Sequence, residues 1–393
     1  MSTPASNSVG MPIKVMLVDD SAIIRGLYRR MLVDNPAVEI VTDAGNGEQA
    51  VRRLEENLSV EVIILDIEMP IMDGLTAIPL LLKTKPNVMI LMSSTLTAQN
   101  ADTSLRAIQA GAADYLQKPT TNSELTSGQD FRSELLMRIE ALGTAARRKA
   151  RQPPRQASTT SSPSPVAAGR PSATPFATVN KSGWNLSTSK GATLRSPGTL
   201  KPKVVAIGSS TGGPEALRDV IQSLSIDINL PVVITQHMPP MFTKILAERL
   251  DKSGVWTCRE AENGDELKPG LALVAPGGHH MLIKKSNNKY VVELDDSPPE
   301  NFCRPAVDPM FRSVTRAFGG AVLGVVLTGM GNDGTKGGKD IIDAGGTIIA
   351  QDEESSIVWG MPGAVTDAGL CSKLVPIKEI AKYITNFVIR SLR

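Results

Sequence analysis

The chain has 393 residues, a formal net charge of +2 and 41% hydrophobic residues, a composition that favours two or three soluble domains. The aromatic content of 4% and the near-neutral charge argue against a nucleic-acid-binding protein. Three scattered cysteines, Cys258, Cys303 and Cys371, predict reduced thiols. The sequence shows no signal peptide, and no apolar run approaches the roughly 18 residues of a membrane span. We therefore expect a cytoplasmic protein that is not embedded in a membrane.

Apolar runs alternate with amphipathic segments in the first part of the chain, after a small, polar tail at 1–11 that is expected to be disordered. The pattern predicts strands at 13–18, 39–41, 61–65, 88–92 and 114–117, and helices at 21–33, 48–56, 75–83, 101–110 and 131–141. Such a series of βα units predicts a doubly wound parallel sheet. Functional residues of such sheets lie at the carboxyl ends of the strands.

Polar side chains stand at these predicted strand ends. They are Asp19, Asp20, Asp66, Ser94 and Lys118. Three carboxylates that converge on one point repel one another unless a cation lies among them, and oxygen-only ligands suit Mg²⁺. A carboxylate beside Mg²⁺, a lysine and a hydroxyl is suited to accept a phosphoryl group. The alternative is a set of separate, solvated acids.

Residues 12–130 resemble the receiver domain of two-component response regulators. Besides the strand-end residues, the resemblance rests on Met69-Pro70, Asp73-Gly74 and Lys118-Pro119. It implies a flavodoxin-like (βα)5 fold in which Asp19 and Asp20 help Asp66 to hold Mg²⁺ and Asp66 is the phosphoacceptor.

The same resemblance implies three switch residues. Ser94 and Lys118 would sense the phosphoryl oxygens, and Tyr115 matches the aromatic switch position. Residues 131–144 are then the last receiver helix.

Residues 145–200 have a different composition. A basic run at 147–151 is followed by a tract rich in Ser, Thr, Pro, Ala and Gly with few large apolar residues. Such a tract buries too little apolar surface to offset its ordering entropy, which predicts a flexible linker.

The alternation resumes at residue 203 and predicts a second α/β domain over 201–393. Strands are expected at 204–207, 232–236, 271–274, 290–294, 321–327 and 347–350, and helices at 214–224, 242–250, 308–318, 340–344 and 377–392. We expect a doubly wound, mostly parallel sheet of the kind that hydrolases use.

Ser210, His237 and Asp333 follow three of these strands. A serine hydroxyl becomes a nucleophile when a base takes its proton and a buried carboxylate orients the base. Alternatives remain at this point. Ser210 is also suited to cap a helix, and the 329–334 segment matches the glycine spacing of a dinucleotide-binding loop, with Asp352 one βα unit later. A cysteine hydrolase that uses Cys303 or Cys258 with the histidine is a further possibility.

The second domain resembles the CheB methylesterase family. The resemblance rests on four blocks: Gly208-Ser209-Ser210-Thr211-Gly212-Gly213, Thr235-Gln236-His237-Met238-Pro239-Pro240, Arg304-Pro305-Ala306-Val307-Asp308 and Leu327-Thr328-Gly329-Met330-Gly331-Asn332-Asp333-Gly334. With the receiver, it extends over nearly the whole chain. One departure is that Cys303 stands where enteric members have a histidine before Arg-Pro.

The resemblance implies an esterase that uses Ser210 as nucleophile, His237 as general base and acid, and Asp333 as the orienting carboxylate. The expected oxyanion donors are the backbone N–H groups of Met330 and Thr211. The substrates would be glutamate γ-methyl esters and glutamines of methyl-accepting chemoreceptors, with methanol released from the esters.

The resemblance implies that the esterase reaction needs no cofactor and that receiver phosphorylation needs Mg²⁺. The other implied partner is a chemotaxis histidine kinase, and a monomer is expected. A receiver joined to a hydrolase further predicts a switch, in which the unphosphorylated receiver covers the Ser210 site and phosphorylation of Asp66 loosens the cover.

Overall fold

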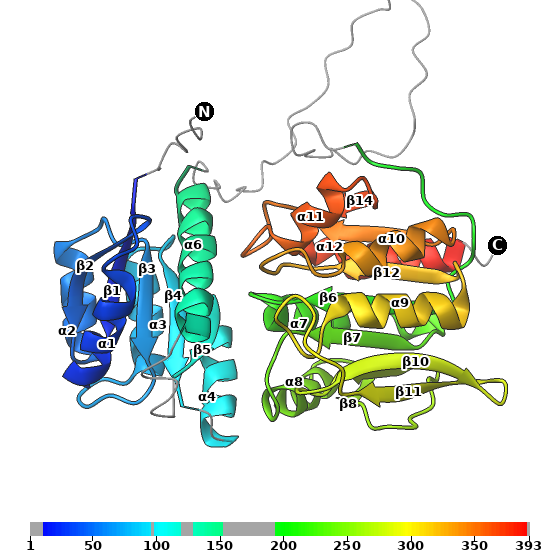
Figure 1. Ribbon diagram of the computed structural model, residues 1–393, viewed down its shortest axis with the longest axis horizontal. Coiled ribbons are helices and arrows are strands. Elements are labelled where there is room, and N and C mark those ends of the chain that lie inside the picture. The colour runs from blue at the N-terminus through cyan, green and yellow to red at the C-terminus, as the bar shows by residue number, and fades with distance from the viewer. Residues whose placement is uncertain (1–10, 96–97, 119–128, 152–192, 391–393) are drawn as a thin grey trace, which may run out of the picture.

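The computed structural model describes residues 11–95, 98–118, 129–151 and 193–390, which form two α/β domains (Figure 1). None of the helices in these ranges is long and apolar enough to cross a membrane. Residues 1–10 of the predicted tail, most of the predicted linker and residue Pro119 lie outside the described ranges.

The first domain is a five-stranded parallel sheet in the order β2-β1-β3-β4-β5. Its strands are β1 (Ile13–Val18), β2 (Val38–Ala44), β3 (Val62–Asp66), β4 (Met89–Ser94) and β5 (Asp114–Gln117). Its helices are α1 (Ala22–Leu32), α2 (Gly47–Glu56), α3 (Gly74–Thr84), α4 (Ala98–Gln109) and α6 (Gln129–Arg151). Because both faces of β3 are covered by helices, all five of its residues are buried. The predicted doubly wound fold is confirmed.

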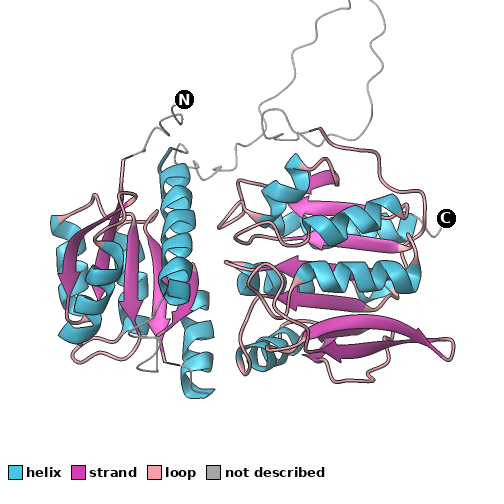
Figure 2. Ribbon diagram, viewed as in Figure 1, coloured by secondary structure: helices cyan, strands magenta, loops and turns pink. Residues whose placement is uncertain are grey.

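The second domain is built on a seven-stranded parallel sheet in the order β14-β13-β12-β6-β7-β9-β8 (Figure 2). Its strands are β6 (Val204–Ser209), β7 (Val232–Gln236), β8 (Thr257–Glu260), β9 (Leu271–Val274), β12 (Val322–Val326), β13 (Thr347–Gln351) and β14 (Cys371–Val375). Its helices are α7 (Gly213–Ser223), α8 (Phe242–Asp251), α9 (Val307–Phe318), α10 (Thr335–Asp343), α11 (Met361–Asp367) and α12 (Ile377–Arg390). A separate antiparallel hairpin joins β10 (His280–Ser286) to β11 (Lys289–Asp295).

The order of the strands brings β6 between β7 and β12 at the centre of this sheet. The apolar β-branched residues of these strands are buried on both faces, as the near-continuous apolar runs predict. The carboxyl ends of the three central strands therefore lie side by side, and the loops that follow them meet there.

Several elements differ from the predicted ones. Strands β8, β10 and β14 and helix α11 are additional, and α10 begins five residues before its predicted start at 340. Helix α6 continues to Arg151, so the predicted boundary at 144 falls inside a helix. The continuation is stabilised by Ala145 and Ala146, which are buried, and by an ion pair between Arg147 and Glu61 at 2.6 Å.

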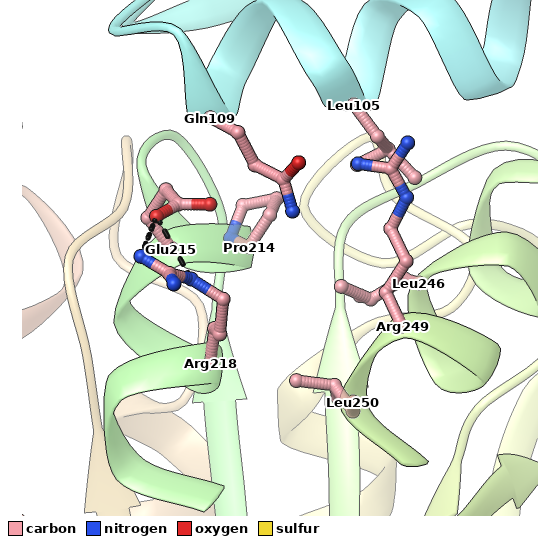
Figure 3. A pocket seen from close by; sticks show the side chains of 8 residues that line it. All are labelled: Leu105, Gln109, Pro214, Glu215, Arg218, Leu246, Arg249 and Leu250. Atoms are coloured by element: carbon pink, nitrogen blue, oxygen red, sulfur yellow. Dashed lines mark hydrogen bonds and ion pairs between the residues drawn. The ribbon is translucent and has the colours of Figure 1, made fainter. Parts of the chain in front are cut away.

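The receiver packs against the second domain through α4, which contacts α7 and α8. Tyr115 of β5 stacks on Phe242 of α8, with ring centroids 4.5 Å apart. Beside this contact, Arg249 forms an ion pair with Asp102 at 2.7 Å. A small cavity remains between the three helices (Figure 3); it is lined by Leu105, Gln109, Pro214, Glu215, Arg218, Leu246, Arg249 and Leu250.

Candidate active site

Ser210 lies in the tight turn between β6 and α7. Its backbone N–H donates to Thr328 O at 3.0 Å, and its carbonyl oxygen accepts from Gly213 N at 2.7 Å and from Gln236 Nε2 at 2.9 Å. Gly212 allows the turn because it adopts a φ of 77°, which disfavours residues with a Cβ. The backbone of Ser210 is therefore fixed from three neighbouring segments. Its hydroxyl makes no hydrogen bond within the described part of the chain.

His237 follows β7, and its backbone N–H donates to Ser209 O at 3.1 Å, which joins it to the turn that carries Ser210. On the imidazole, Nε2 lies 2.8 Å from Asp333 Oδ2. The structure thus brings together His237 and Asp333 as a hydrogen-bonded pair. It places Ser210 on the adjacent strand end without a Ser–His hydrogen bond in this state.

Asp333 is 1% exposed and lies in the loop between β12 and α10. Its Oδ1 accepts from Asp308 N and Gly334 N, each at 2.9 Å, and its Oδ2 accepts from Val307 N. Burial raises the pKa of this carboxyl, but His237 and the backbone N–H groups outweigh burial and lower it. Asp333 is therefore held as a carboxylate in a fixed orientation, as a residue that orients an imidazolium must be.

Asn301 and Asp308 complete this network, although neither was predicted to be a site residue. Asn301 Nδ2 donates to Asp333 Oδ1 at 2.9 Å and to Asp308 Oδ2 at 3.2 Å. Burial and the charge of Asp333 raise the pKa of Asp308. The only sequence signal for them is the Arg304–Asp308 block, which contains Asp308 and lies three residues after Asn301. Both residues act on Asp333 and not on Ser210, so no catalytic motif names them.

Cys303 is a second neighbour of the His237 ring. Its interaction with the imidazole favours the protonated ring. Burial by itself lowers the pKa of His237, but its interactions with Cys303 and with the Asp333 carboxylate raise it to about 10. In this state His237 holds its proton at neutral pH and is not ready to act as a base.

Both predicted oxyanion donors are free to donate a hydrogen bond to a substrate. The backbone N–H groups of Thr211 and Met330 find no acceptor among the described residues. Such unsatisfied donors next to a nucleophile are suited to stabilise a developing negative charge.

The glycine-spaced loop has a structural explanation. Gly331 and Gly334 adopt φ angles of 84° and 89°, which bring Asp333 back toward the sheet. Asp352 accepts from the backbone N–H of Ser355 at 3.1 Å, within its own turn. The features that suggested a dinucleotide loop thus serve to place the aspartate and to close a local turn.

The acidic residues of the receiver also meet. Oxygens of Asp19, Asp20 and Asp66 lie within 4.8 Å of one another, and Lys118 Nζ lies 2.8 Å from both Asp19 and Asp66. One ammonium against three carboxylates leaves excess negative charge. Burial and the neighbouring Asp19 raise the pKa of Asp66, against the effect of Lys118. This oxygen-only cluster fits a divalent cation such as Mg²⁺.

The predicted switch residues lie in different surroundings. Ser94 Oγ is 3.2 Å from Ser104 Oγ of α4, whereas the preceding Ser93 pairs with Asp66 in the strand register and bonds Tyr28 Oη at 2.6 Å. Tyr115 is 6% exposed because it packs on the second domain. Ser93 is a receiver residue that sequence reasoning missed.

A direct link joins the receiver to the Ser210 turn. Thr211, the residue after Ser210, donates its hydroxyl to Asp114 Oδ2, and Arg138 of α6 pairs with the same carboxylate. Met330 packs at a hydrophobic cluster that joins receiver residues to Val358 of the second domain. The receiver thus contacts Thr211, one of the two residues that carry the predicted oxyanion donors.

Comparison with protein families finds two matches along the chain. Residues 15–128 match the response regulator receiver domain, and residues 205–384 match the CheB methylesterase.

Similar proteins include the protein-glutamate methylesterase/protein-glutamine glutaminase of Azospirillum brasilense, 48% identical over 99% of this chain and 96% of the relative. A second, from Paramagnetospirillum magneticum, is 47% identical over 99% of this chain and 98% of the relative. Among solved structures, the catalytic domain of Thermotoga maritima CheB methylesterase is 42% identical, with a TM-score of 0.47 over 48% of this chain and all of that one. The chain therefore belongs to the CheB methylesterase family, with an N-terminal receiver domain.

Proposed function

We propose that Ser210, His237 and Asp333 form the catalytic triad of this family member. The chain is a protein-glutamate methylesterase/protein-glutamine glutaminase of chemotaxis adaptation. The observation that carries the catalytic assignment is the hydrogen bond of 2.8 Å between His237 Nε2 and Asp333 Oδ2, at the strand end beside the Ser210 turn.

In the proposed reaction, Ser210 Oγ attacks the γ-carbonyl carbon of a glutamate methyl ester while His237 takes the hydroxyl proton. Asp333 stabilises the imidazolium that forms. The oxyanion is stabilised by the backbone N–H groups of Thr211 and Met330, and collapse of the intermediate releases methanol after protonation by His237. Water then hydrolyses the acyl-enzyme by the same steps. A glutamine substrate follows the same path with ammonia as the leaving group.

In the receiver, Asp66 is the proposed phosphoacceptor. Asp19, Asp20 and Asp66 would hold Mg²⁺, which neutralises the charge of the incoming phosphoryl group when bound. Lys118, already between Asp19 and Asp66, contacts the phosphoryl oxygens, together with Ser94 after it turns away from Ser104.

Phosphorylation activates the esterase in this proposal. The receiver holds Thr211 through Asp114, so its release frees the turn that carries Ser210. Tyr115 connects phosphorylation of Asp66 with release of the receiver. It lies on β5, the edge strand of the receiver sheet, and stacks on Phe242 of the second domain.

The proposed substrates are the cytoplasmic helices of methyl-accepting chemoreceptors, and the proposed phosphodonor is a chemotaxis histidine kinase. We place the protein in the cytoplasm as a monomer that contacts the membrane only through its substrate.

Methanol release from methylated receptor membranes tests the catalytic assignment. Ser210→Ala should lower the rate on the order of 10⁴-fold. Alanine has no hydroxyl to attack the ester, and a water molecule does not replace the serine nucleophile efficiently. A serine-directed phosphonate should label Ser210 in the wild type and not in His237→Ala. An unchanged rate in Ser210→Ala would sink the assignment.

A further inference from the structure

Phe302 is a large apolar side chain with an exposed fraction of 94%, the highest among the exposed large hydrophobic residues described. It stands between Asn301, which donates to Asp333, and Cys303, which influences the pKa of His237. No residue in the described ranges covers it. A side chain of this size is therefore presented to solvent at the edge of the active site.

The backbone at Phe302 is unfavourable for a residue with a Cβ. Glu300 and Cys303 exchange two backbone hydrogen bonds, at 3.1 and 2.9 Å, which makes 301–302 a two-residue turn. Both central residues have positive φ, 52° for Asn301 and 63° for Phe302. Such turns favour asparagine or glycine at these positions. The hairpin of β10 and β11 follows this rule with Asn287 and Asn288.

The turn is also held firmly. Arg312 of α9 pairs with Glu300, and Asn301 is bound to two carboxylates. Farther out, the buried His280 joins both ends of the loop, because its Nδ1 accepts from Ala306 N and its Nε2 bonds Pro298 O. The phenyl ring is thus carried on a fixed support beside the triad. Preorganised aromatic side chains of this kind are efficient binding anchors.

Neither packing nor backbone preference explains a phenylalanine here, since the ring is exposed and the turn favours glycine. We propose that Phe302 is a specificity-determining residue that packs on apolar surface of the substrate polypeptide next to the glutamate ester and so positions the ester at Ser210. This inference rests on the proposed function. Esters that are too small to reach the turn at 301–302 should be hydrolysed at the same rate with or without the Phe302 ring.

Phe302→Gly tests the inference in the full-length protein, because glycine removes the ring and suits the backbone. We expect kcat/KM for methanol release from methylated receptor membranes to fall roughly tenfold, chiefly through KM. Hydrolysis of p-nitrophenyl acetate and phosphonate labelling of Ser210 should be unchanged, and the melting temperature equal or higher. Phe302→Leu should recover part of the loss.

Ile71→Gly is the matched control, because Ile71 is 80% exposed with a φ of 70° in the receiver. Measured without a phosphodonor, it should leave receptor demethylation unchanged. Equal receptor demethylation by wild type and Phe302→Gly overturns the inference, as does a parallel loss on both receptor and small ester. A wild type that releases no methanol from receptors overturns the proposed function and the inference together.

Discussion

At the scale of single residues, the protonation of His237 decides whether the proposed triad is ready to react. Burial lowers the pKa of its ring, while the two neighbouring residues Cys303 and Asp333 raise it to about 10. A general base must be unprotonated, so the rate rises as pH passes through this pKa. Cys303 therefore restrains the base by making its protonated form more stable.

Cys303→Ala should consequently lower the pKa of His237 and move the rising limb of the pH–rate profile toward lower pH. Hydrolysis of p-nitrophenyl acetate by the full-length protein, followed from pH 6 to pH 10, measures this shift. At pH 7 the variant should be the faster enzyme. Cys258→Ala is the control, because Cys258 is buried at β8 and no contact joins it to the triad among the described residues. A profile identical to that of the wild type would contradict a restraining role for Cys303.

At the scale of elements, the turn at 300–303 is fixed to the loop between β12 and α10 by one side chain. Asn301→Gly keeps the positive φ and removes the donor shared by Asp333 and Asp308. Because a hydrogen bond to a charged group is worth about 1.5–3 kcal/mol, we expect the free energy of unfolding to fall by a similar amount. Denaturant titration measures it.

Asn287→Gly makes the same change at the turn of the β10–β11 hairpin, where φ is 46° and no side-chain hydrogen bond is made by Asn287 in the described structure. It should cost a few tenths of a kcal/mol at most. Equal losses in the two variants would show that Asn301 acts only through its backbone.

The sequence predicted the elements whose local pattern agrees with the final packing. The buried strands β6, β7 and β12 are apolar runs, and both sheets place their polar residues at the carboxyl ends as expected. Strand β10 was predicted as loop because its second half, Lys284 to Ser286, is exposed and polar.

Contacts distant in sequence account for the remaining differences. The end of α6 is helical because Arg147 reaches Glu61 and Arg148 donates to Ser356 O in the second domain. Asn301 is joined to Asp333 across 32 residues. No local motif reports such contacts, so the sequence blocks could suggest a triad but not the residues that hold Asp333 in place.

At the scale of the whole molecule, the receiver and the esterase are coupled through one interface. It combines an aromatic stack, a hydrogen bond onto the Ser210 turn and the ion pair between Arg249 and Asp102. The ion pair lies away from the triad, on α8 and α4, so its charges can be changed without altering the reacting groups. It is therefore the best place to weaken the interface selectively.

Arg249→Asp places two negative charges opposite each other and should raise basal ester hydrolysis about fivefold, since an ion pair of this exposure is worth up to about 1 kcal/mol. Asp102→Arg combined with Arg249→Asp restores opposite charges and should return the basal rate to that of the wild type. Phosphorylation with Mg²⁺ and a small phosphodonor should stimulate the wild type and the double variant, and stimulate Arg249→Asp less. Asp66→Asn should abolish the stimulation in every background. If Arg249→Asp hydrolysed esters no faster than the unphosphorylated wild type, the docked receiver would not be the inhibitory element, and release of Thr211 could not be the activating step.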